Sequence, residues 1–214
     1  MKAKFIPVML NTSGREVVVF GGGKEAFRKA KLLAANCEKI TVVSTYFIPE
    51  FSKLDIRKIK PDIMNEEDIK PLINKSSIVI IAADDSGLRQ KLKEICVEAG
   101  ILYNEVDEIN SPIVFPAIYE DFGVTISVST SGKSPAFSKF LRDALGNMAK
   151  PYAIALPVIE ELRKQVRPFS YHEKVEYFQK LFHTDRFWES IKEEKTKEAY
   201  AIGCELIEAE KLKK

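Results

Sequence analysis

The chain has 214 residues, of which 45% are hydrophobic and 30% are charged, and its formal net charge is +2. This length accommodates one large or two small domains with a substantial core. The near-neutral balance does not indicate a nucleic-acid binder. Three scattered cysteines without a CxxC pair indicate neither a disulfide framework nor a structural zinc site. The apolar run at the start is too short for a signal sequence or a membrane span, so we expect a cytoplasmic protein that does not bind membranes.

The first elements expected along the chain are a strand, a glycine turn and a helix. After Glu16, four consecutive apolar residues, three of them valine, lead directly into three glycines. Residues 24–36 place apolar side chains at helical spacing, and residues 39–44 read as a second strand. Together they predict a βαβ unit.

The alternation of strands and helices continues to about residue 110. Strands are expected at 54–59, 77–83 and 101–106, and helices at 88–99 and after a cap at Asn65. This order predicts an α/β fold with a Rossmann-like, doubly wound parallel sheet.

The pattern changes after Asn110. Residues 113–120 and 124–130 read as the strands of an antiparallel hairpin. A polar loop follows, and Pro135 is well placed in the first turn of a helix. Residues 151–214 are helical in character and evenly charged.

The glycine turn is the first candidate site. Residues 21–26 fit the pattern G-x-G-x-x-A, with glycine at Gly21, Gly22 and Gly23. Glycines after a strand and before a helix let backbone N–H groups approach a pyrophosphate. The strand–turn–helix context favours dinucleotide binding over a turn that serves packing alone.

The end of the second expected strand is unusual for this class of site. Many NAD-binding proteins place an acid there for the ribose, whereas this chain has Ser44, Thr45 and Tyr46. No arginine follows nearby that would favour a 2′-phosphate. The residues therefore favour NAD over NADP without deciding between them.

Three acids follow later strands. Asp84 and Asp85 come after the run that ends at Ala83, and Asp107 comes after the next strand. Ligands collect at the carboxyl ends of parallel strands, which makes all three candidates. Helix capping is the favoured interpretation for Asp84 and Asp85. Asp107 is the stronger candidate, because Asn110 and the residues after it indicate a loop.

Residues 128–135 (VSTSGKSP) are rich in hydroxyl groups and carry one lysine. Such a segment at a helix start can bind a carboxylate through hydroxyls, backbone N–H groups and charge. An ordinary capped helix start is the alternative.

Several motifs in one order give the chain a specific resemblance. The motifs are FIPVMLNTSGREVVVFGGGKEAFRKAKLL, TYFIPEF, IIAADD, YNEVD and VSTSGKSPAFSKFLR. Their order and spacing over residues 4–145 resemble the siroheme synthase family. The resemblance implies an NAD-binding Rossmann domain over 1–112, a dimerisation segment over 113–150 and a helical domain over 151–214.

The resemblance also implies an activity and a set of site residues. The activity is oxidation of precorrin-2 to sirohydrochlorin with NAD as hydride acceptor, in a homodimer. Some relatives also insert ferrous iron. Asp107 takes the position of the family's catalytic aspartate, and Thr130, Ser131 and Lys133 are the expected substrate-binding residues. The expected cofactor-binding residues are Gly21, Gly22, Gly23, Lys24, Glu25, Ser44, Thr45, Tyr46, Ala83 and Asp84. No resident metal is expected.

Two other functions stay open at this point. One is a non-catalytic NAD-sensing module, which usually has an acid at the position of Ser44 and gives no reason for residues 128–135. The other is a chelatase without dehydrogenase activity, against which the intact glycine turn argues. The sequence does not decide whether metal is inserted.

Overall fold

The structure is a computed structural model that describes residues 4–61 and 65–212. The chain forms two compact units that meet between Phe115 and Pro116. Within the described ranges, no helix has both the length and the apolar character needed to cross a membrane.

The first unit contains a five-stranded sheet in which every strand runs parallel to its neighbours. The order is β3-β2-β1-β4-β5. This confirms the doubly wound parallel sheet, because β1 lies in the middle and the chain winds outward on both sides of it. The strands are β1 (Glu16–Phe20), β2 (Lys39–Val43), β3 (Arg57–Ile59), β4 (Ile78–Ile81) and β5 (Leu102–Glu105).

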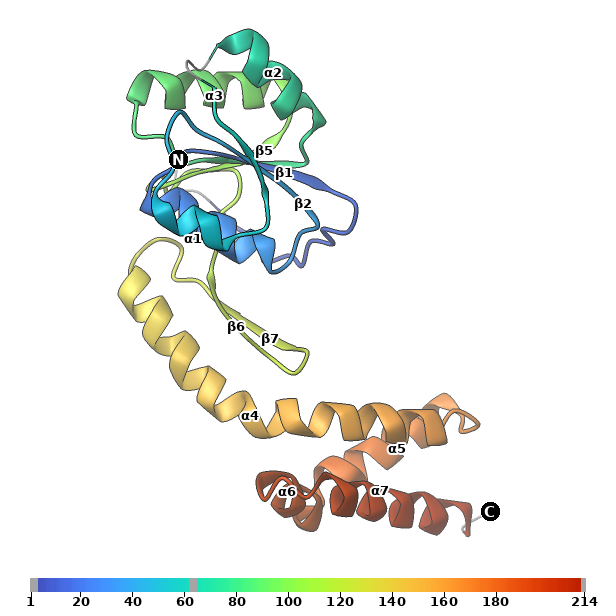
Figure 1. Cartoon of the computed structure of the whole chain (residues 1–214). Helices are drawn as coiled ribbons and strands as arrows, with labels where there is room; N and C mark the ends of the chain where they lie inside the picture. The colour runs from blue at the N-terminus through green and yellow to red at the C-terminus, as the bar shows by residue number, and fades with distance from the viewer. Residues whose placement is uncertain (1–3, 62–64, 213–214) are drawn as a thin grey trace. The chain divides into compact units, whose positions relative to one another are not determined.

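Helices cover both faces of this sheet (Figure 1). Val17 and Val19 belong to the core cluster that includes α1 (Lys24–Ala34), whereas Val18 and Phe20 pack with α2 (Glu66–Lys75) and α3 (Ser86–Ala99). Successive strand side chains point to opposite faces, so a run of valines can fill two cores.

Two sequence expectations in this unit need correction. The strand expected at 54–59 is shorter, because residues 49–53 form a 3₁₀ helix and Leu54 and Ile56 pack against the α1-side core. Asn65 does precede α2, but its side chain makes no capping hydrogen bond.

The second unit begins with an antiparallel hairpin of β6 (Ala117–Asp121) and β7 (Val124–Val128). The expected strand at 113–120 starts later, because Ile113 and Phe115 pack into the core of the first unit. Phe122 and Gly123 both have positive φ angles, of 42° and 82°, which matches the tight two-residue turn of a hairpin.

Four helices complete the second unit. Their core includes Leu162, Tyr177 and Phe187, and the Tyr177 hydroxyl donates to the carbonyl of Gly203 at 3.1 Å. The helices are α4 (Pro135–Gln165), α5 (Tyr171–Phe182), α6 (Asp185–Lys192) and α7 (Thr196–Lys211). Helix α4 continues without interruption through residue 150, the expected boundary between the dimerisation segment and the helical domain. The three-part division of the chain stays a prediction.

Candidate functional site

The glycine turn at the end of β1 is a position that larger residues cannot occupy. Gly21 has a φ of 134°, and a Cβ there would overlap the carbonyl oxygen of Ala82. A Cβ on Gly22 would overlap the carbonyl oxygen of Tyr46. The turn therefore lies directly against the chain leaving β2 and β4, and glycine alone permits this approach.

Gly23 has a different role from its two neighbours. It is the N-cap of α1 in ordinary extended backbone, and no side chain caps the helix. A Cβ at Gly23 would meet only the Tyr46 hydroxyl, at 3.3 Å. Lys24 and Glu25 are exposed in the first helical turn. The start of α1 thus leaves N–H groups and the positive end of the helix dipole open to an anion.

A cavity of about 550 Å³ lies at the carboxyl end of the sheet. This volume falls in the range of small-molecule and cofactor sites. Seven of the ten predicted cofactor-binding residues line it, and the other three are those at the start of α1. The seven are Gly21, Gly22, Ser44, Thr45, Tyr46, Ala83 and Asp84. Asp85, which the sequence offered as a candidate acid, also lines the cavity, whereas sequence reasoning missed the contribution of α3, namely Gly87, Leu88 and Lys91.

A hydrogen bond joins two sides of this cavity. The Tyr46 hydroxyl donates to Asp84 Oδ2 at 2.6 Å, which links the ends of β2 and β4. The hydrogen bond to Asp84 is the main cause that raises the pKa of Tyr46. The end of β2 carries no acid of its own, but the Asp84 carboxylate from the end of β4 therefore lies beside the residues that follow β2. The Lys91 ammonium is paired with Glu66 at 2.9 Å.

The two acids after β4 have separate roles. Asp85 is the N-cap of α3 and accepts a hydrogen bond from the Leu88 N–H at 2.6 Å, which confirms capping there. The same expectation is wrong for Asp84, because its carboxylate binds the Tyr46 hydroxyl instead.

Asp107 lies in a tight turn directly after β5. Its φ is 65°, a left-handed conformation that aspartate tolerates better than most residues. The side chain is exposed, and within the described residues its carboxylate has no ion pair or hydrogen bond. Asp107 is thus an unengaged carboxylate on a fixed turn at the carboxyl end of the sheet.

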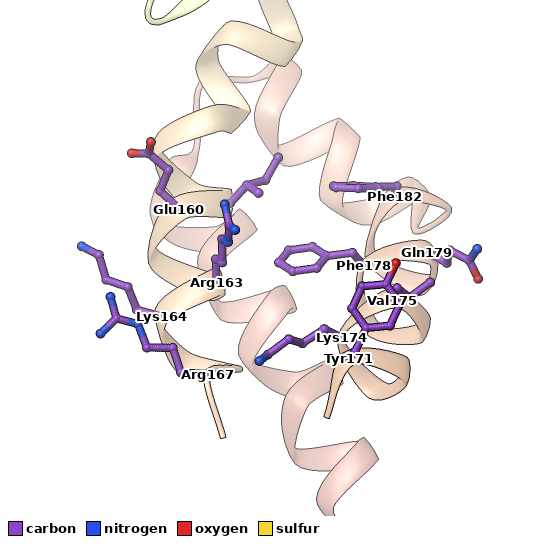
Figure 2. Close-up of a pocket in the computed structure, with 11 residues that line it drawn as sticks. Glu160, Arg163, Lys164, Arg167, Tyr171, Lys174, Val175, Phe178, Gln179 and Phe182 are labelled. Carbon is purple, nitrogen blue, oxygen red and sulfur yellow. The ribbon is translucent and has the colours of Figure 1, made fainter. Parts of the chain in front are cut away.

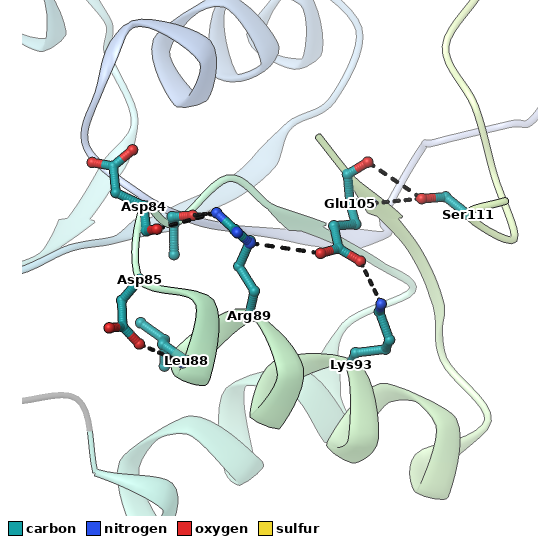
Figure 3. Close-up of polar contacts among 8 residues, drawn as sticks. Asp84, Asp85, Leu88, Arg89, Lys93, Glu105 and Ser111 are labelled. Atoms are coloured by element: carbon teal, nitrogen blue, oxygen red, sulfur yellow. Dashed lines mark hydrogen bonds and ion pairs between the residues drawn. The ribbon is translucent and has the colours of Figure 1, made fainter. Parts of the chain in front are cut away.

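A polar network connects Glu105, at the end of β5, with the rim of the cavity (Figure 3). Arg89 of α3 donates to the carbonyls of Ala83 and Asp84, each at 3.1 Å, and lies 3.7 Å from Glu105. Glu105 also pairs with a second α3 cation, Lys93, at 2.7 Å.

Hydrogen bonds also fix the backbone at the end of β5. The buried Ser111 hydroxyl accepts from the Glu105 N–H at 3.0 Å and donates to the Glu105 carbonyl at 3.3 Å. These contacts fix both ends of the loop that contains Asp107 (Figure 3). Arg89, Glu105 and Ser111 were not predicted from the sequence, since nothing local in the chain signals a contact between α3 and β5.

Lys29 is a further residue that sequence reasoning missed. It is only 8% exposed, and its Nζ lies 4.5 Å from the centre of the Phe115 ring. Burial, followed by the charge of Arg28, lowers the pKa of Lys29 to about 8, while Glu25 and Asp107 act in the opposite direction. The Asp107 carboxylate therefore stabilises a buried ammonium on α1. The signal was available, because Lys29 falls on the apolar face beside Ala26 and Ala30.

The hydroxyl-rich segment of the second unit forms a capped helix start. Ser134 caps α4 by accepting from the Phe137 N–H at 3.2 Å. The Thr130 hydroxyl accepts from the Ser134 N–H and lies 3.0 Å from the Ser138 hydroxyl. Ser131 is exposed with a φ of 52°, and Lys133 is exposed. The Thr130 hydroxyl therefore holds the loop together.

The sheet order, the three glycines and the cavity beside them define a Rossmann-type dinucleotide-binding protein. Sequence comparison agrees with this class. Residues 8–117 match the family described as "Putative NAD(P)-binding".

Comparison with known proteins narrows the class further. The chain is 33% identical over 210 residues to the precorrin-2 dehydrogenase of Methanosarcina barkeri, covering 92% of this chain and 93% of that protein. It is 28% identical to the siroheme synthase of Thioalkalivibrio sulfidiphilus, covering 98% of this chain but 42% of that longer protein. A solved structure named "SirC, precorrin-2 dehydrogenase" superposes with a TM-score of 0.71 at 22% identity, covering 96% of this chain and all of that one, which supports the fold.

The chain belongs to the precorrin-2 dehydrogenase family, whose fold is shared by part of the longer siroheme synthases.

Proposed function

We propose that this protein catalyses the NAD-dependent oxidation of precorrin-2 to sirohydrochlorin. The observation that carries the proposal is the similarity to a precorrin-2 dehydrogenase over nearly the whole of both chains. The glycine turn, the cavity beside it and the free Asp107 carboxylate are the features that this reaction needs.

The residues of the first unit fit a dinucleotide. Gly21 and Gly22 bring the backbone to the cavity where side chains would block it, and the start of α1 offers uncapped N–H groups for a pyrophosphate. Ser44, Thr45 and Tyr46 line the side where the adenosine ribose would lie. When bound, NAD supplies a hydride acceptor. The Asp84 carboxylate near this side favours NAD over the doubly charged 2′-phosphate of NADP.

We assign the proton of the reaction to Asp107. Precorrin-2 loses one hydride to NAD and one proton, so the products are sirohydrochlorin, NADH and a proton. An unengaged carboxylate can accept that proton without breaking an existing contact. Lys133, together with the backbone around Thr130 and Ser131, is proposed to bind substrate carboxylates.

The proposal is tested by mixing protein, NAD and precorrin-2 without oxygen or added metal and following the absorption spectrum. Conversion to sirohydrochlorin that requires both protein and NAD is expected. No conversion by a folded protein that binds NAD would contradict the dehydrogenase function and favour the NAD-sensing alternative. Ferrous iron added after conversion tests for chelation. Among the described residues no cluster of three or more His, Cys, Asp and Glu side chains forms a metal site.

We further propose a homodimer built from residues 113–150. Exposed apolar side chains along α4 support this, notably Phe137 at 51%, Phe140 at 65% and Met148 at 69% exposure. A symmetric dimer would bury them. Light scattering at micromolar concentration should give twice the mass of one 24.2 kDa chain, and a mass of one chain would overturn the dimer.

A further inference from the structure

A second hollow, formed by α4 and α5 of the second unit, contains none of the residues discussed so far. Its volume is about 1100 Å³, slightly above the roughly 300–1,000 Å³ typical of small-molecule sites. Such a space accommodates a large ligand better than a small metabolite. We call it the α4–α5 groove.

The floor of the groove is an apolar face of α5 that the helical core leaves uncovered. Tyr177 and Leu181 bury one face of the helix in that core. The opposite face carries Tyr171, Val175 and Phe182, whose exposures are 84%, 37% and 43%. One helix thus has two apolar faces, and only one of them has a partner within the described residues.

The rim of the groove is strongly cationic. Four cations line it, namely Arg163, Lys164, Arg167 and Lys174, against the single carboxylate of Glu160. Figure 2 shows Arg163 of α4 and Lys174 and Phe178 of α5 directed into the space between the helices.

Three of these cations have no ion-pair partner among the residues that the structure describes. Lys164 pairs with Glu161, whereas Arg163, Arg167 and Lys174 make no ion pair or side-chain hydrogen bond within the described part of the chain. The nearby acids are engaged elsewhere, since Glu173 accepts from the Ser170 N–H and Glu176 pairs with His172.

An aromatic floor with unpaired guanidinium and ammonium groups at its edge selects a particular ligand chemistry. A broad apolar body would cover the floor, and several carboxylates on its periphery would meet the cations, arginine being well suited to such bidentate contacts. A nucleotide fits less well, because Gln179 is the one amide side chain among the lining residues for reading a base.

We propose that the α4–α5 groove binds a tetrapyrrole that carries several peripheral carboxylates, the chemical class of the substrate and product of the proposed reaction. The class of ligand follows from the groove, and the choice of a tetrapyrrole within that class rests on the proposed function. The groove gives the second unit a ligand-binding role of its own, in addition to Lys133 and the loop before α4.

The test uses uroporphyrin, an aromatic tetrapyrrole with eight carboxylates that needs neither NAD nor turnover. Binding to the full-length protein is followed by porphyrin fluorescence and absorption. The double variant Arg163→Gln, Arg167→Gln removes two unpaired cations. The matched control Lys192→Gln, Lys195→Gln removes two exposed cations outside the groove. Tyr171→Ser removes an exposed part of the floor.

We expect uroporphyrin affinity to fall by about tenfold or more in the Arg163, Arg167 variant, as charge-assisted contacts are lost. It should fall less in Tyr171→Ser and stay near wild type in the control pair. Affinity that is the same in all variants would overturn the proposal. A change of oligomeric mass in the Arg163, Arg167 variant without loss of uroporphyrin binding would also overturn it, because the groove would then be an interface between copies. Turnover of precorrin-2 by the wild-type protein separates the two proposals. If the wild-type protein converts precorrin-2 but uroporphyrin affinity is the same in all variants, the groove proposal fails and the proposed function stands.

Discussion

The two units of this protein position their candidate ligand-binding residues in different ways. In the first unit, polar residues follow the carboxyl ends of parallel strands, so the topology of the sheet brings them together. In the second unit, Arg163 and Lys174 lie on different helices, α4 and α5, and become neighbours only because both helices pack into one helical core. Sites tied to strand ends can therefore be predicted from local sequence, and sites made by helix packing cannot.

The largest expected effect is at Asp107. Removal of a general base lowers turnover by about 10²- to 10⁴-fold. The φ of 65° makes Asp107→Ala a poor choice, because alanine is strained in the left-handed region. Asp107→Asn and Asp107→Gly both keep this backbone and remove the carboxylate. Both should lose precorrin-2 turnover by that factor and keep wild-type NAD affinity in calorimetry. Near-normal turnover in either folded variant would exclude Asp107 as the base.

The next effect concerns Lys29 and depends on pH. The pKa of Lys29 is about 8 in the folded protein against 10.5 in the unfolded chain. The unfolded state therefore binds more protons between these values, and wild-type stability rises with pH across this range. The difference corresponds to at most roughly 3 kcal/mol opposing folding below pH 8.

Lys29→Met should thus be more stable than wild type at pH 7. The gain in the free energy of unfolding should be smaller than the upper limit given above, because the substitution also changes the contact with Phe115. Its stability advantage over wild type should shrink at pH 10. Urea unfolding at both pH values measures this, with the exposed Lys31→Met as control. A stability difference that is independent of pH would contradict the buried charge.

A smaller effect is expected at the glycine turn. Gly23 has ordinary backbone angles and room for a Cβ, so Gly23→Asp should fold and can cap α1. Its carboxylate would repel a pyrophosphate at the same N–H groups. We expect NAD affinity to fall by about tenfold or more, or about 1.4 kcal/mol, with an unchanged thermal midpoint. Gly23→Asn supplies the same shape without the charge. Unchanged NAD affinity in folded Gly23→Asp would place the cofactor elsewhere.

The smallest effects compare the two units directly. Asp85 caps α3 in the first unit and Ser134 caps α4 in the second. Replacing either with alanine should cost about 1 kcal/mol. If the units unfold separately, Asp85→Ala should shift only the first unit's transition and Ser134→Ala only the second's. Equal shifts of a single transition in calorimetry would show that the two units unfold together.

The first unit was predictable because its signals are local. The glycines follow a buried strand, and the alternation of strands and helices determines which strand ends meet. The contribution of α3 was missed, since Arg89 reaches Glu105 and the Ala83 carbonyl only after the sheet has formed. Lys29 was missed although its spacing places it on the apolar face of α1, because a lysine is usually exposed and the Phe115 ring that covers it is distant in the sequence.

The second unit was less predictable for the same physical reason. The sequence left a carboxylate-binding loop and a capped helix start as alternatives for residues 128–135. Only the structure shows the Thr130 hydroxyl engaged with Ser134 and Ser138. From the sequence, the cations of the α4–α5 groove belong to an evenly charged helical segment. Their clustering could not be predicted, because a sequence does not reveal which faces of two helices lie opposite each other.

We propose that the cavity beside the glycine turn and the Asp107 carboxylate together make a dehydrogenase. The most direct test follows NADH and sirohydrochlorin in the same anaerobic, metal-free sample of wild-type protein with precorrin-2 and NAD. We expect both products to appear at the same rate, with one NADH for each sirohydrochlorin. Sirohydrochlorin formed without NADH would contradict this mechanism. A rate of sirohydrochlorin formation that is the same in Asp107→Asn as in wild type would contradict it as well.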